Sequence, residues 1–147
     1  MNSITSNQQK PFDILVVDDT PANLKLLVEL LSGQGYHVRP ANSGELALRS
    51  IKASKPDLIL LDVKMTGMDG YEVCLSLKAD ESTADIPVIF ISALDDEPSK
   101  VKGFEVGGVD FISKPFQKEE VLARVKTHID LYLLQRELKT RNQLLEE

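Results

Sequence analysis

Three acidic residues follow short apolar runs in this sequence. Asp18 and Asp19 come directly after residues 14–17, and Asp62 comes directly after residues 58–61. Carboxylates that are brought close together raise each other's pKa, so they need a cation to remain ionised together. Proteins bind Mg²⁺ through a few carboxylates, together with water and phosphate oxygens. The three residues therefore predict a Mg²⁺ site, provided that the fold brings them together.

A hydroxyl and an amine occupy equivalent places after two further apolar runs. Ser92 follows residues 87–91, and Lys114 follows residues 111–112 after one intervening position. A hydroxyl and an ammonium group can hold the oxygens of a phosphoryl group, and a carboxylate can accept that group. Together the five side chains predict phosphoryl transfer, with a carboxylate nucleophile, a metal ion and donors for the charge that develops.

Helical patterns separate these apolar runs. Thr20-Pro21 is a typical helix start, with Thr as the N-cap and Pro at the first helical position. Further helices are predicted after Asn42-Ser43, after Gly70, over residues 98–106 and from Gln117 onward. The predicted strands are residues 14–17, 36–39, 58–61, 87–91 and 111–112. Strands that alternate with helices predict an α/β fold: a doubly wound, five-stranded parallel sheet of the flavodoxin-like (βα)5 type, with an extended C-terminal helix.

The parallel arrangement decides where the chemistry would lie. All five strands would run the same way, so their carboxyl ends would meet at one edge of the sheet. Any single acidic residue at such an end could equally cap the next helix or lie in solvent. Here acidic residues, a hydroxyl and a lysine occupy equivalent places after four of the predicted strands, which favours one common site.

The sequence resembles the receiver domains of response regulators, which act on the output side of histidine kinases. The resemblance covers about residues 11–130 and rests on the segments ILVVDDTPANL, PDLILLDVKMTGMDGYEVC, IPVIFISAL and GFEVGGVDFISKPF. It implies a phosphorylation-dependent signalling switch that takes a phosphoryl group from a histidine kinase or phosphotransfer protein with the help of Mg²⁺. It also implies that the chain is not an enzyme beyond its own phosphorylation and slow dephosphorylation.

The resemblance implies a role for each acidic residue. Asp62 would be the phosphoacceptor. Asp19 would bind Mg²⁺ directly, and Asp18 would bind it directly or through water. Asp62 and the backbone carbonyl of Lys64 would complete the protein ligands.

Ser92 and Lys114 would bind the phosphoryl group in the same comparison. Phe111 would be the switch aromatic, whose ring changes rotamer when Ser92 moves. The resemblance also implies a cis peptide bond between Lys114 and Pro115, which an X-Pro bond allows. Thr66 departs from the family, which usually has proline at this place. The departure puts the stiffness of the loop in question, but not the phosphoryl chemistry.

The composition argues against several partners. The net charge of the 147-residue chain is −6, without a long run of like charge, so we expect no binding to nucleic acid or to a membrane. No apolar run approaches the ~20 residues that span a bilayer, and the first ten residues do not resemble a signal peptide. Cys74 is the single cysteine and cannot form an internal disulfide, which favours a cytoplasmic setting.

The two ends of the chain differ from its centre. We expect residues 1–10, which are rich in Ser, Asn and Gln, to form a disordered arm, and residues 131–147 to form a helical linker or short coiled coil. The tail has a leucine seam at 131, 134, 138 and 145, interrupted by Arg141. This seam, and the face made by the fourth helix, fifth strand and fifth helix, predict a homodimer. We expect a downstream output module beyond Glu147.

Three other functions compete with this interpretation. A Mg²⁺-dependent aspartyl phosphatase would also use an Asp nucleophile, but would carry it as Asp-x-Asp after the first strand. A flavin-binding electron carrier would need a glycine- and hydroxyl-rich phosphate loop where this chain has Asp18 and Asp19. A receiver-like interaction domain that acts without phosphorylation is the third, and the full set of site residues favours the phosphorylated switch over it.

Overall fold

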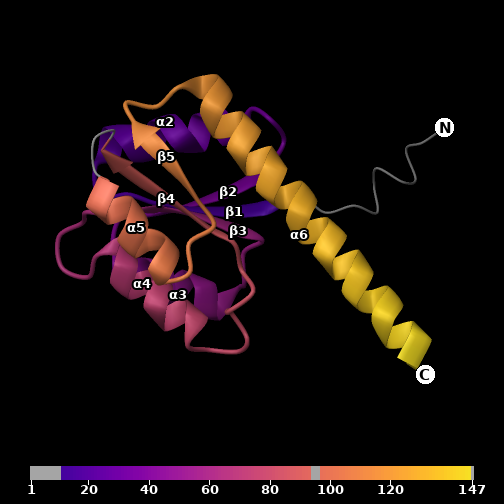
Figure 1. Cartoon of the computed structure of the whole chain (residues 1–147). Helices are drawn as coiled ribbons and strands as arrows, with labels where there is room; N and C mark the ends of the chain where they lie inside the picture. Colours follow the sequence, from indigo (N-terminus) through magenta and orange to yellow (C-terminus); the bar gives the residue numbers. More distant parts are fainter. Residues whose placement is uncertain (1–10, 94–96, 147) are drawn as a thin grey trace.

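A parallel sheet with strand order β2-β1-β3-β4-β5 forms the centre of the molecule. The computed structural model describes residues 11–93 and 97–146, so the arm expected over residues 1–10 lies outside it (Figure 1). The strands are β1 (Asp13–Val17), β2 (His37–Ala41), β3 (Leu58–Asp62), β4 (Val88–Ala93) and β5 (Asp110–Lys114). The helices are α2 (Pro21–Ser32), α3 (Gly44–Ala53), α4 (Gly70–Lys78), α5 (Glu97–Glu105) and α6 (Lys118–Glu146). The predicted doubly wound, flavodoxin-like fold with an extended C-terminal helix is confirmed.

Helices cover both faces of the sheet. Helices α2 and α6 lie on one face, and α3, α4 and α5 lie on the other (Figure 1). Every residue of β3 is buried, as expected for a central parallel strand whose side chains pack on both faces. Alternate residues of the strands join two apolar clusters, one under each helical layer.

The edge strands differ from their predicted bounds. β2 begins at His37 rather than at residue 36 and continues through Pro40 to Ala41. An edge strand accepts proline because one side of its backbone has no partner strand. β5 runs from Asp110 to Lys114, longer than the predicted residues 111–112, because each of its residues pairs with β4.

The predicted start of α2 is confirmed, with Thr20 as the N-cap and Pro21 in the first turn. The Thr20 hydroxyl, however, accepts no capping hydrogen bond. The Thr20 backbone N–H instead donates to Asp18 Oδ1 at 2.9 Å, because a charged carboxylate two residues earlier is a strong local acceptor. In α3 the prediction is confirmed, since Ser43 accepts a hydrogen bond from the Leu46 N–H.

Helix α6 begins in the core and extends beyond it (Figure 1). In its first half, Val121, Val125 and Ile129 are buried against the sheet. Arg124 donates two hydrogen bonds, of 2.8 and 3.0 Å, to the Asp110 carboxylate at the start of β5. None of the helices in the described part of the chain combines the length and apolar character needed to cross a bilayer.

The connection from β3 to α4 is fixed at both ends. The Val63 N–H donates to Ile91 on β4, and the Gly70 N–H donates to the Val63 carbonyl. Asp69 and Glu72 form a reciprocal capping box at the start of α4. A Cβ at Gly70 would lie 2.3 Å from the Asp62 carbonyl oxygen, so the first turn of α4 packs directly on the Asp62 backbone.

This close approach predicts that Gly70→Ala destabilises the fold by about 1–3 kcal/mol or more, because backbone rather than a movable side chain blocks the added methyl group. Gly33→Ala is the control, since its Cβ would meet no atom closer than 3.4 Å and its φ of −63° suits alanine. We expect a change below about 1 kcal/mol for the control. Urea unfolding measures both, and equal midpoints for the two variants would contradict the packing of α4 on the Asp62 backbone.

Candidate functional site

Among the described residues, three polar or charged residues are buried, and all three lie at the carboxyl edge of the sheet. Asp18, Asp62 and Ser92 are 0%, 2% and 4% exposed. Asp18 follows the last residue of β1, Asp62 is the last residue of β3, and Ser92 lies near the end of β4. Burying such groups is unfavourable without partners, so their concentration at one edge indicates a site rather than core packing.

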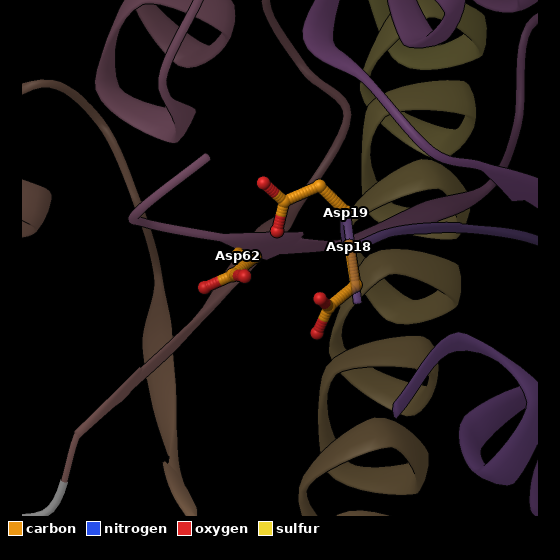
Figure 2. Close-up of side chains that lie close together, drawn as sticks. All are labelled: Asp18, Asp19 and Asp62. Carbon is orange, nitrogen blue, oxygen red and sulfur yellow. The ribbon is translucent and has the colours of Figure 1, made fainter. Parts of the chain in front are cut away.

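The three predicted carboxylates converge. One oxygen each from Asp18, Asp19 and Asp62 lies within 4.8 Å of the others (Figure 2). The strand register explains this, because Val17 on β1 is directly paired with Leu61 on β3 and the acids come next in both segments. Asp19 is the partly exposed member of the cluster.

Lys114 reaches this cluster from β5. Its Nζ lies 3.2 Å from Asp62 Oδ2 and 3.9 Å from Asp18 Oδ2. The expected cis peptide bond between Lys114 and Pro115 is present. Three carboxylates and one ammonium group leave an excess of two negative charges when all are ionised.

The pKa of Asp62 records this excess of negative charge. This pKa is raised from 3.8 to about 6: burial is the largest cause, the nearby Asp18 carboxylate adds to it, and the attraction of Lys114 opposes both. Ionised Asp62 therefore needs more positive charge than Lys114 provides.

Two buried atoms at this edge have no hydrogen-bond partner, Asp18 Oδ2 and Ser92 Oγ. A cavity of about 100 Å³ lies beside Ser92 and is lined by Asp62, Val63, Lys64, Ser92, Ala93 and Lys114. One water takes up roughly 30 Å³ of liquid, so the cavity suits a group of phosphoryl size. Unpartnered buried polar atoms beside a small cavity indicate a ligand that completes them.

The acidic cluster has the donor set for Mg²⁺. Mg²⁺ prefers oxygen ligands at about 2.1 Å, which places opposite oxygens of its octahedron about 4.2 Å apart. Adjacent oxygens of the octahedron are about 3.0 Å apart, so the three carboxylate oxygens, which lie within 4.8 Å of one another, would draw closer together around the ion. A divalent cation would also balance the two excess negative charges. Asp18, Asp19 and Asp62 are therefore able to hold the ion.

Lys64 and Phe111 lie differently with respect to the carboxylates. Lys64 lines the cavity, and its backbone N–H lies 3.4 Å from Asp62 Oδ1; its carbonyl as a metal ligand stays a prediction. Phe111 is buried in the core, with its ring centroid 5.5 Å from that of Phe90 and 5.1 Å from that of Phe104. Phe90 is two residues before Ser92 on the same strand, so Phe111 neighbours the site without entering it.

Thr66 is a neighbour of the site that sequence reasoning missed. Its backbone N–H lies 3.0 Å from Asp19 Oδ2, and its hydroxyl lies 3.4 Å from the same oxygen. The available signal was the residue type: a residue other than proline has a free N–H in a loop beside several carboxylates.

Comparison with known proteins agrees with this geometry. Residues 14–126 match the family described as "Response regulator receiver domain". The chain is 44% identical over 128 residues to response regulator PleD of Caulobacter vibrioides, covering 87% of this chain and 28% of PleD. It is 42% identical over 113 residues to the DNA-binding dual master transcriptional regulator RpaA of Synechocystis, covering 77% of this chain and 47% of RpaA. The chain thus spans less than half of either relative.

Solved structures give the same result. The receiver domain of NtrX from Brucella abortus superimposes with a TM-score of 0.76 at 30% identity, covering 80% of this chain and 98% of that domain. The matched residues include all the carboxylates, the serine and the lysine gathered at the sheet edge. The chain therefore belongs to the response regulator receiver domain family of two-component signalling proteins.

Proposed function

We propose that this domain is a switch in which Asp62 accepts a phosphoryl group from a phosphohistidine of a kinase or phosphotransfer protein, with Mg²⁺ bound at the acidic cluster. The observation that carries the proposal is the burial of Asp18, Asp62 and Ser92 at one edge of the sheet, where Asp62, Ser92 and Lys114 line a small cavity. Membership of the receiver family supports it.

In the proposed reaction, a carboxylate oxygen of Asp62 forms a bond to phosphorus while the phosphorus–nitrogen bond of the donor breaks. The electron pair of that bond returns to the ring nitrogen of the donor histidine. Mg²⁺, when bound, supplies positive charge to the phosphoryl oxygens, and Asp18, Asp19, Asp62 and the Lys64 carbonyl would hold it.

Two donors would bind the phosphoryl oxygens. The ammonium group of Lys114 lies 3.2 Å from Asp62 Oδ2. After phosphorylation it would bind an oxygen of the phosphoryl group, which then carries the negative charge. Ser92, whose hydroxyl has no partner, would donate to another oxygen. Movement of Ser92 would change the space available to Phe111, whose ring contacts Phe104 on α5. The α5–β5–α6 face would thereby report the state of Asp62.

The alternatives fit the site less well. An aspartyl phosphatase needs room for the leaving group of its substrate, and a cavity of about 100 Å³ offers little. A receiver-like domain that acts without phosphorylation would have no need for three buried polar groups and two unpartnered atoms at one edge. Both alternatives predict different outcomes when the acceptor assignment is tested with a small phosphodonor.

We further propose that residues 11–130 form the switching unit and that residues 131–147 are a helical linker that pairs with a second copy and leads to an output module. In support, Leu131, Leu134 and Leu138 are 46%, 52% and 51% exposed along α6. Such a seam on a helix is stabilised when a second helix covers it. Arg141 interrupts the seam, so the pairing of the isolated chain would be weak.

The acceptor assignment predicts that wild-type protein incubated with acetyl phosphate and Mg²⁺ gains the mass of one phosphoryl group. Asp62→Asn, or removal of Mg²⁺ with EDTA, should abolish the gain. Asp80→Asn is the matched control, because it neutralises a carboxylate at the C-terminal end of α4, away from the site. Equal modification of Asp62→Asn would place the acceptor elsewhere, and no modification of wild type would favour the interaction domain.

The raised pKa of Asp62 predicts how stability depends on pH. Between about pH 4 and 6, folded Asp62 binds a proton that the unfolded chain releases, so acidification stabilises the metal-free fold through this residue. Asp62→Asn should therefore be more stable than wild type at pH 7.5, by on the order of 1–3 kcal/mol. This advantage should shrink towards pH 5.

Urea unfolding in EDTA at pH 5, 6 and 7.5 measures the difference in the free energy of unfolding between the two proteins. The titration of other groups, such as Asp110, cancels in this difference. In a second series with Mg²⁺ in place of EDTA, stabilisation of wild type by Mg²⁺ should weaken as the pH falls through about 6, because protonated Asp62 no longer binds the ion. An advantage of Asp62→Asn that grows on acidification would contradict a raised pKa for Asp62.

The linker proposal predicts that beryllofluoride, a mimic of the phosphoryl group, increases dimerisation in sedimentation experiments. Leu138→Glu should weaken that association about tenfold or more, because pairing would then bury a charge in the seam. Gln143→Glu places the same charge on the same helix outside the seam and should have little effect. A monomer at high concentration with and without the mimic would contradict the pairing.

A further inference from the structure

Thr66 holds the carboxylate of Asp19 through two hydrogen bonds. The Thr66 N–H donates to Asp19 Oδ2 at 3.0 Å, and the Thr66 hydroxyl donates to the same oxygen at 3.4 Å. These are the hydrogen bonds that the Asp19 carboxylate accepts within the described part of the chain. They connect the loop after β3 to the loop after β1, so both acidic loops are joined on the solvent side of the cluster.

Asp19 is the member of the cluster that most needs such a contact. Asp18 and Asp62 are buried; Asp18 accepts a hydrogen bond from the Thr20 N–H, and Asp62 accepts one from Lys114. Asp19 is partly exposed and lies beside two like charges. Repulsion and hydration both favour turning its carboxylate outwards. The Thr66 contacts oppose that rotation.

The loop that carries Thr66 is able to act as a fixed support. It is anchored before Thr66 by the Val63 N–H on Ile91, and after it by the Gly70 N–H on Val63. Gly67, the next residue, has a φ of +80°, a conformation that favours glycine and turns the chain directly after the contact. The Thr66 amide is thus presented to Asp19 by backbone that is held on both sides.

We propose that Thr66 is a positioning residue that keeps the Asp19 carboxylate in the orientation required to bind the divalent cation. The inference rests on the proposed function only in placing a cation at this cluster. Because Thr66 acts through Asp19, it affects the affinity of the site for the cation, and therefore the cation concentration at which the site fills. The rate of phosphorylation at saturating Mg²⁺ is unaffected by it, whereas the rate at low Mg²⁺ depends on it.

Mn²⁺ is a suitable probe, because the paramagnetic resonance signal of the free ion reports binding without any phosphoryl chemistry. Thr66→Pro removes both donors and should weaken Mn²⁺ binding roughly three- to tenfold, whereas Thr66→Ala keeps the N–H and should weaken it by about threefold or less. Thr66→Ser keeps both donors and should bind like wild type. Ser82→Ala is the matched control, since it removes a hydroxyl donor from the exposed Asp80 carboxylate.

The possible results separate this inference from the proposed function. If wild type does not bind Mn²⁺, the metal site itself is wrong. If wild type binds Mn²⁺ and folded Thr66→Pro binds it equally well, the role of Thr66 is wrong. Should Thr66→Pro fail to fold, amide exchange decides: the Thr66 amide must be protected in wild type and lose that protection in Asp19→Ala. A Thr66 amide that exchanges as an open loop amide in both proteins overturns the proposal.

Discussion

Three carboxylates meet at one edge of the sheet, where Lys114 is paired with Asp62, and the rest of the structure is arranged around this concentration of negative charge. The strand order places β1 beside β3, which makes Asp18 and Asp62 neighbours, and Lys114 reaches them from β5 across β4. The helices on both faces exclude water from Asp18 and Asp62, which raises the pKa of Asp62. Within residues 11–93 and 97–146, the buried side-chain polar atoms without a hydrogen-bond partner lie at this edge, so the binding of positive charge there is coupled to stability.

Much of the fold could be predicted because central strands carry a simple signal. All residues of β3 are buried, and Leu58 to Leu61 form a continuous apolar run whose short length favours a strand over a helix. β5 was predicted too short because Asp110, Ser113 and Lys114 are polar residues, and only their pairing with β4 makes them strand. Thr20 was correctly predicted as the N-cap of α2, but the absence of a bond to its hydroxyl could not be predicted from the residue type.

The candidate site was predictable to the extent that it depends on strand ends. Parallel strands bring their carboxyl ends together whatever the loops do, so the convergence of Asp18, Asp19 and Asp62 followed from topology. The contact between Thr66 and Asp19 depends on the shape of two loops, which sequence spacing does not specify. The packing of Phe111 on its aromatic neighbours depends in turn on how three elements fit together.

Helix α6 is one continuous helix, so a small tilt at its base becomes a larger displacement at its far end. Its buried first half packs in the same cluster as Ile112, two residues before Lys114, while its C-terminal part projects from the domain (Figure 1). The 29-residue helix is about 43 Å long, so a tilt of roughly 5° at its base would displace its far end by roughly 4 Å. A change of atomic size beside Lys114 can thus become a change in the spacing of whole helices, without any movement of the sheet.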